Sequence, residues 1–221
     1  LGWDLRGQGK SEGKRGYVED FGDFASDLDL FIKFAKAQLH SRGKPMFLFG
    51  HSLGGLITIK TVINHAPGGI TALTLSAPAL GVTLEVPKVK VKAAQILSDW
   101  LPKVTLYNEI DYGLLHRDQE LLKEYRKDPL RHEKISPRLF LGMNAAIEEA
   151  FEHASEIHQP VLLQLAGVDK IVNTSEAERF FDLLTSKKKE ILVYAESYHE
   201  IFNDLGREQV FRDLKDFLNR S

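Results

Sequence analysis

The stretch Met46-Phe47-Leu48-Phe49-Gly50-His51-Ser52-Leu53-Gly54-Gly55 carries the strongest structural signal in this 221-residue chain. Its first four residues are an apolar run typical of a strand that is buried on both faces of a parallel sheet. The G-x-S-x-G pattern that follows leads into a helix-like segment, Leu56 to His65. A serine in this context stands on a sharp turn that exposes its hydroxyl at the carboxyl end of the sheet. The stretch therefore predicts a strand, a nucleophile elbow and a helix.

The residues around Ser52 have separate expected roles. The residues two before and two after Ser52 must be small if the turn is to close. We therefore expect steric crowding to explain why glycine occupies positions 50 and 54. We expect His51 to shape the elbow rather than to act as a base. The turn aims the backbone N–H of Leu53 at the substrate oxygen that gains charge, so we predict this amide as one oxyanion-hole donor.

A serine hydroxyl becomes a good nucleophile only when a base takes its proton, and a third group must orient that base. In a strand–turn–helix hydrolase the chain order is Ser, then the acid, then His. Asp169 follows the apolar run 160–167, and His199 follows the run 190–195. We predict that Ser52, Asp169 and His199 form a catalytic triad. The alternatives are a turn or helix-capping role for Asp169 and a surface position for His199.

The rest of the chain alternates apolar runs with helical periodicity. This order predicts an α/β fold in which a mostly parallel sheet is flanked by helices on both faces. Beyond the elbow region, the predicted strands cover 70–75, 160–167 and 190–195, and the predicted helices cover about 21–40, 175–184 and 200–218.

The segment 80–158, which we call the cap segment, has a different texture, with lysines, prolines and amphipathic helices. We predict a core formed by 1–79 and 159–221, interrupted by a helical cap or lid at 80–158. An apolar helix face ringed by lysines can rest on a lipid surface, so transient membrane contact through the cap is expected; the alternative is that this face packs on the core. The residues concerned are Val86, Val89, Val91, Ala94, Ile96, Leu97, Trp100 and Leu101, with Lys88, Lys90 and Lys92.

Composition excludes several classes of protein. A formal net charge of −2 gives no basic excess for nucleic acid, and the absence of cysteine rules out disulfides and thiolate-bound metal. No apolar run approaches the roughly 20 residues that a membrane helix needs. We expect a cytoplasmic protein, peripheral to membranes at most, with no metal and no cofactor; the sequence does not indicate an oligomeric state.

Three weaker patterns are set aside. Gly9-Lys10-Ser11 resembles the end of a phosphate-binding loop, but the opening glycine of that motif is Asp4 here. The spacing of His199 and Asp204 resembles some acyltransferase motifs, but a pattern of two residues is weak. His116 and Asp118 are too isolated to indicate a metal site.

Taken together, the motifs resemble the monoacylglycerol lipase and lysophospholipase branch of the α/β-hydrolases, which is related to serine aminopeptidase-type hydrolases. The resemblance spans the chain and implies hydrolysis of a small lipid ester without a cofactor. Its matching segments are Asp4 to Ser11, Gly50 to Gly55, His116 to Asp118, Tyr125 to Leu130, Asp169 to Val172 and Tyr198 to Glu200.

Three departures from that branch limit what the resemblance implies. Gln8 replaces the usual histidine of the first motif, and Phe202 stands where some monoacylglycerol lipases have a second histidine near glycerol. The substrate therefore stays open between monoacylglycerol, lysophospholipid and simple esters. The branch also has an upstream H-G loop with a second oxyanion donor, and we expect that loop and the first strands to precede Leu1. A related peptidase and a non-catalytic binding protein are the alternative functions.

Overall fold

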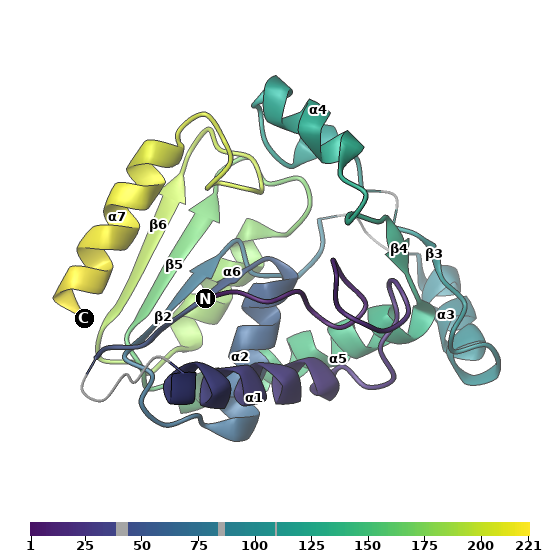
Figure 1. The fold of residues 1–221 in the computed structure, drawn as a ribbon, viewed down its shortest axis with the longest axis horizontal. Coiled ribbons are helices and arrows are strands. Elements are labelled where there is room, and N and C mark those ends of the chain that lie inside the picture. Colours follow the sequence, from purple (N-terminus) through teal and green to yellow (C-terminus); the bar gives the residue numbers. More distant parts are fainter. Residues whose placement is uncertain (39–43, 84–86, 109) are drawn as a thin grey trace.

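The computed structural model describes residues 1–38, 44–83, 87–108 and 110–221. Within them the main sheet has the strand order β1-β2-β5-β6, and each neighbouring pair is parallel (Figure 1). The carboxyl ends of the strands therefore lie at one edge. This confirms the predicted α/β class and the parallel sheet. The strands are β1 (Phe47–His51), β2 (Ala72–Ser76), β5 (Val161–Ala166) and β6 (Lys189–Tyr194).

Helices cover both faces of the sheet (Figure 1). On one face lie α1 (Gly22–Gln38), α2 (Leu53–His65), α5 (Pro137–Glu152) and α6 (Thr174–Leu183), which all contribute to the largest buried cluster. On the other face lies α7 (Arg207–Arg220), whose Phe217 is fully buried.

Alternation along the strands explains the two-sided core. Leu73 and Leu163 belong to the cluster shared with α1, α2, α5 and α6, whereas Ala72 and Leu162 pack with Phe217 of α7. Successive side chains of a strand point to opposite faces, so a strand covered on both sides must be apolar at every position. This is the physical reason for the continuous apolar runs in the sequence.

The start of the last helix was predicted wrongly. The apolar pattern suggested a helix from about residue 200, but 200–206 forms turns and α7 begins at Arg207. The Asp204 carboxylate accepts hydrogen bonds from the N–H of Leu205, inside this segment, and from the N–H of Tyr198, just before it. Such side-chain contacts with the backbone compete with helical pairing. The other predicted elements of the main sheet and its helices match to within about three residues, and the predicted end of the first helix at 39–40 lies outside the described residues.

Between β2 and β5 the chain leaves the main sheet, and this part of the chain contains the cap segment. Its elements are α3 (Lys88–Trp100), β3 (Leu106–Tyr107), the 3-10 turn η1 (Tyr112–Leu114), α4 (Gln119–Lys127), β4 (Lys134–Ile135), α5 and the 3-10 turn η2 (Ala154–Glu156). The antiparallel pair β3–β4 was not predicted, because strands of two residues leave no periodic signal.

The two ends of the cap segment lie in different surroundings. Helix α4 lies near the carboxyl ends of the strands, while α5 runs along the helical layer beside α2 (Figure 1). Ala146 and Ala150 of α5 are buried in the main core, and Glu149 forms an ion pair with Lys60 of α2. The last helix of the cap segment thus supports the core, and the domain boundaries at 79/80 and 158/159 stay a prediction.

We expect Leu163→Ala to lower the free energy of unfolding by about 3 kcal/mol, because it opens a cavity in a central, fully buried strand. Val193→Ala on β6 is the control, since that side chain is 47% exposed and its truncation is expected to change stability by less than about 1 kcal/mol. Urea denaturation of both variants checks this. Equal effects would contradict the burial that we assign to β5.

Candidate active site

Ser52 lies on a strained turn between β1 and α2. Its φ of 50° and ψ of −119° fall in a region that non-glycine residues rarely adopt. The surrounding backbone holds it there: the Ser52 N–H donates to the Ser76 carbonyl at 3.0 Å, and the Ser52 carbonyl accepts from Leu56 and Ala79. The elbow is therefore fixed against the carboxyl end of β2.

The steric expectation for the flanking glycines is confirmed at Gly50 and wrong at Gly54. A Cβ on Gly50 would lie 2.5 Å from the Gly54 carbonyl oxygen and 2.8 Å from the Gly55 Cα, which are backbone atoms that cannot move aside. A Cβ on Gly54 would meet nothing within 4 Å, whereas one on Gly55 would lie 2.8 Å from Pro78. The backbone of Gly54 thus lies close to Gly50, but the position after Ser52 that has no room for a side chain is Gly55 rather than Gly54.

The structure brings Ser52, His199 and Asp169 into one hydrogen-bonded chain. His199 Nε2 lies 2.9 Å from Ser52 Oγ, and His199 Nδ1 lies 2.8 Å from Asp169 Oδ2. Asp169 follows β5 and His199 follows β6, so the three residues come from the carboxyl ends of different parallel strands. The geometry fits one tautomer, in which Nδ1–H donates to Asp169 and Nε2 accepts from the Ser52 hydroxyl.

Asp169 is also held by its own loop. Its other carboxylate oxygen accepts hydrogen bonds from the backbone N–H groups of Ile171 and Val172, both at 2.9 Å. The side chains of Asp169 and His199 are 0% and 4% exposed. The buried Asp169 carboxylate therefore both stabilises its own turn and contacts His199. His199 is not the surface histidine of the alternative interpretation.

His51 contacts both the end of β2 and the ring of His199. Its Nδ1 is 3.1 Å from both the backbone carbonyl and the hydroxyl of Ser76, and its ring centroid is 4.9 Å from that of His199. Burial, with the nearby His199 ring, lowers the pKa of His51 to about 4. The ring is thus neutral near pH 7 and packs against the elbow, as expected from the sequence.

Leu53 is the first residue of α2. The first N–H groups of a helix have no intrahelical acceptor, and the helix dipole places partial positive charge there. Ser52, the residue before the helix, makes no capping hydrogen bond with its side chain. The N–H of Leu53 therefore has no acceptor within α2 and directly follows Ser52, which is a suitable environment for an oxyanion.

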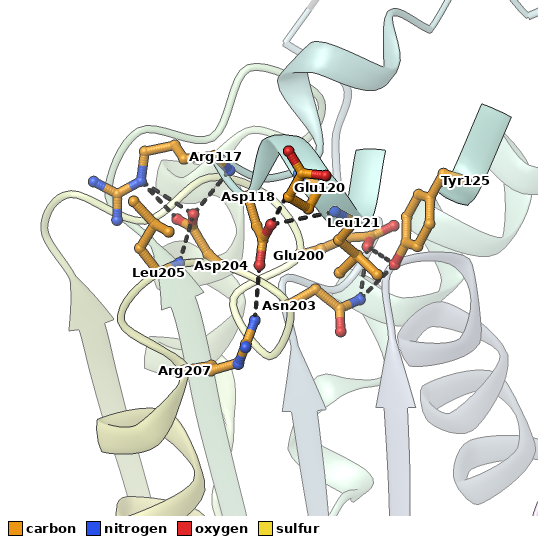
Figure 2. Close-up of polar contacts among 10 residues, drawn as sticks. All are labelled: Arg117, Asp118, Glu120, Leu121, Tyr125, Glu200, Asn203, Asp204, Leu205 and Arg207. Carbon is orange, nitrogen blue, oxygen red and sulfur yellow. Dashed lines mark hydrogen bonds and ion pairs between the residues drawn. The ribbon is translucent and has the colours of Figure 1, made fainter. Parts of the chain in front are cut away.

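A second polar cluster, which sequence analysis missed, surrounds the His199 loop (Figure 2). Asp204 accepts from Arg117 at 3.0 Å, and Glu200 accepts from the Tyr125 hydroxyl at 2.6 Å. Arg117 and Tyr125 belong to the cap segment. The sequence had singled out the His199–Asp204 spacing and the segments His116 to Asp118 and Tyr125 to Leu130, but nothing in these patterns indicates that they contact one another.

The candidates that were set aside have structural surroundings of their own. Asp118 caps α4 by accepting from the N–H groups of Glu120 and Leu121, and it pairs with Arg207. His116 is buried with its ring edge-on to Tyr125. Across the described ranges, no group of three or more His, Cys, Asp or Glu side chains is placed to hold a metal ion.

The chain is similar to known proteins over most of its length. Residues 1–206 match the family model described as "Serine aminopeptidase, S33". The chain belongs to this family. A solved monoacylglycerol lipase from Paleococcus ferrophilus is 33% identical to it, with a TM-score of 0.85 over 99% of this chain and 82% of that one. The family and this similarity establish the α/β-hydrolase fold.

Other relatives of this family member have lipid-related names. Phospholipase YtpA of Bacillus subtilis is 29% identical over 98% of this chain and 83% of that protein. Monoglyceride lipase of Homo sapiens is 29% identical over 96% of this chain and 70% of that protein. A soluble variant of monoglyceride lipase from Saccharomyces cerevisiae, 22% identical, has the same fold with a TM-score of 0.85 over 98% of this chain and 75% of that one.

The glycines give a sharp test of the elbow. We expect Gly50→Ala to lower the free energy of unfolding by about 2 kcal/mol or more, because the added methyl overlaps backbone atoms. Gly54→Ala should be neutral or stabilise by up to about 1 kcal/mol, since it adds a better helix former in open space. Thermal unfolding of the two variants would contradict this account if Gly54→Ala were the more damaging.

Proposed function

We propose that this chain is a serine hydrolase of monoacyl lipid esters, in which Ser52 is the nucleophile, His199 the general base and Asp169 the residue that orients the base. The observation that carries the proposal is the hydrogen-bonded chain from Ser52 Oγ through both nitrogens of His199 to Asp169. Nucleophile, base and orienting acid at these distances are what acyl transfer by a serine requires.

The proposed reaction proceeds in two halves. Ser52 Oγ attacks the ester carbonyl carbon as His199 Nε2 takes its proton, and the Leu53 N–H donates to the oxyanion. The tetrahedral intermediate then expels the alcohol, which leaves with the proton from His199. Water, deprotonated by His199, attacks the acyl carbon. The second tetrahedral intermediate then releases the carboxylic acid as His199 returns the proton to Ser52 Oγ. Asp169 stabilises the imidazolium in both halves.

The lipid-ester assignment is supported by the names of the relatives. Proteins called monoacylglycerol lipase, monoglyceride lipase and phospholipase cover most of this chain at 28–33% identity. The family description includes an aminopeptidase, which would share the same three residues and differ in its substrate contacts. Phe202 belongs to the same loop as His199, and its ring packs against Phe49 and Phe211. A phenyl ring offers no hydrogen bond to a glycerol head, so lysophospholipid and simple esters are retained as substrates beside monoacylglycerol.

We expect Ser52→Ala to abolish ester turnover, with a loss of roughly 10⁵-fold or more in kcat, because no other hydroxyl replaces the nucleophile. The measurement is a panel of p-nitrophenyl esters of increasing chain length, monoacylglycerol, lysophosphatidylcholine and an aminoacyl anilide. Ester turnover that persists in folded Ser52→Ala would contradict the proposed nucleophile. Turnover of the anilide alone would assign the protein to the peptidases, and binding without turnover would assign a non-catalytic role.

We further propose that α3 contacts a lipid surface while the enzyme acts. Val89, Ile96 and Trp100 are 74%, 59% and 82% exposed, and their spacing of seven and four places them on one side of the helix. The exposed side chains of Lys88, Lys90 and Lys92 suit an anionic surface.

Other parts of the predicted lipid-facing set differ in burial. Val91, Ala94 and Leu97 are half-buried on the side of α3 that packs against α5, and Val86 lies outside the described residues. No described helix combines the length and apolar character needed to cross a bilayer.

Trp100→Ala is expected to weaken binding to vesicles that contain anionic lipid by roughly tenfold, equivalent to about 1.4 kcal/mol of lost apolar burial. Turnover of a short water-soluble ester should stay unchanged. Leu183→Ala on α6 is the matched control, because that side chain is also exposed but lies on another helix. Equal vesicle binding by wild type and Trp100→Ala in a sedimentation assay would refute the proposed contact.

A further inference from the structure

The residue before His199 is held by a buried carboxylate. Asp204 is 0% exposed and accepts from the Tyr198 N–H at 2.9 Å, from the Leu205 N–H at 2.9 Å and from the Arg117 N–H at 2.9 Å. The Arg117 guanidinium adds a contact through Nε at 3.0 Å. One side chain thus connects the His199 loop, the turn before α7 and the cap segment.

The residue after His199 is held by the same part of the cap segment. The Glu200 N–H donates to the Leu115 carbonyl at 2.7 Å. The Glu200 carboxylate accepts from Tyr125 of α4 at 2.6 Å and from Asn203 at 2.8 Å (Figure 2). His199 therefore lies between two backbone amides that are both anchored, one through Asp204 and one through Leu115.

This anchoring replaces secondary structure. Residues 195–206 form turns and bends, so regular hydrogen bonding of a helix or strand does not fix the His199 backbone. Yet His199 must keep Nε2 within 2.9 Å of Ser52 and Nδ1 within 2.8 Å of Asp169 at the same time. A displacement of about 1 Å in such a constellation can lower the rate by roughly 10²-fold.

We propose that Asp204 is a positioning residue for His199. Asp204 and Arg117 of the cap segment together form a clamp that holds the His199 loop. The inference rests on the proposed function, since it assigns Asp204 a role in the reaction through His199. Asp204 touches neither the substrate nor the reacting atoms. Its role is to hold the Tyr198 amide, and with it the imidazole, in the orientation that both hydrogen bonds of His199 require.

The charge of Asp204 suits this role. Burial raises the pKa of this carboxyl, but the hydrogen bonds from Arg117, Tyr198 and Leu205 lower it further, so the net pKa lies below the ordinary value. An ionised carboxylate accepts several strong hydrogen bonds at once, which a neutral amide of the same shape cannot do. Asp204→Asn therefore removes the charge and part of the acceptor capacity while it keeps the volume.

The experiment compares Asp204→Asn, Arg117→Gln and Glu149→Gln with wild type on a water-soluble ester. Glu149→Gln is the matched control, because it breaks the Lys60–Glu149 pair between α2 and α5, away from the His199 loop. We measure kcat and KM separately, the rate at which a fluorophosphonate labels Ser52, and the thermal midpoint of each variant.

Asp204→Asn is expected to lower kcat and the labelling rate by roughly 10- to 100-fold, with KM changed by less than about twofold. Arg117→Gln should show a smaller loss of the same kind, since three backbone donors to Asp204 remain. Glu149→Gln should lower the thermal midpoint and leave kcat and labelling unchanged.

Folded Asp204→Asn with wild-type kcat and labelling would overturn the inference and leave Asp204 a purely structural residue. If Asp204→Asn does not fold, Arg117→Gln decides: an unchanged kcat overturns the clamp, and a lowered kcat with unchanged KM supports it. A wild-type protein without ester turnover would instead overturn the proposed function, and this inference with it.

Discussion

The backbone at Ser52 is the constraint on which the rest of the site depends. A non-glycine residue with φ of 50° persists only when its neighbours hold it there, and here the hydrogen bonds to Ser76 and Ala79 do so. Gly50 leaves room for the turn because any side chain at this position would overlap backbone atoms. The same turn ends β1, starts α2 and exposes the hydroxyl. The end of β1, the start of α2 and the position of the Ser52 hydroxyl thus follow from one local geometry.

The parallel sheet supplies the remaining geometry. Because β1, β5 and β6 run in the same direction, the segments that follow them emerge at one edge and bring Ser52, Asp169 and His199 together from positions far apart in the chain. The strands are rigid, but the His199 loop has no regular structure, and its contacts with Leu115, Arg117 and Tyr125 come from the cap segment. The cap segment and the loop that carries His199 are therefore in direct physical contact.

Sequence alone predicted the helices and strands, whose apolar residues recur at regular spacing. It missed individual side-chain contacts, which leave no such pattern. Apolar runs identified the strands, and the G-x-S-x-G pattern with its chain order identified the three residues that the structure brings together. The start of α7 was misplaced because the Asp204 carboxylate competes with helical pairing, a side-chain effect that apolar spacing does not reveal. The partners of Asp204 were equally hidden, since Arg117 lies in a different segment of the chain. The room for a side chain at Gly54 depends on how the backbone folds around it, which the G-x-S-x-G pattern does not reveal.

The chain leaves the sheet after β2 and returns as β5, and these two strands are hydrogen-bonded neighbours. The exit and re-entry points are therefore fixed by the sheet, whatever the intervening segment contains. Closing a longer loop between fixed ends is cheap, at about 0.6 kcal/mol for each doubling of its length. Changes in the length or sequence of α3 and α4 should accordingly carry little penalty to folding. The short region 115–118 is the exception, because the loop that carries His199 is hydrogen-bonded to Leu115 and Arg117, so we expect this region to tolerate fewer changes.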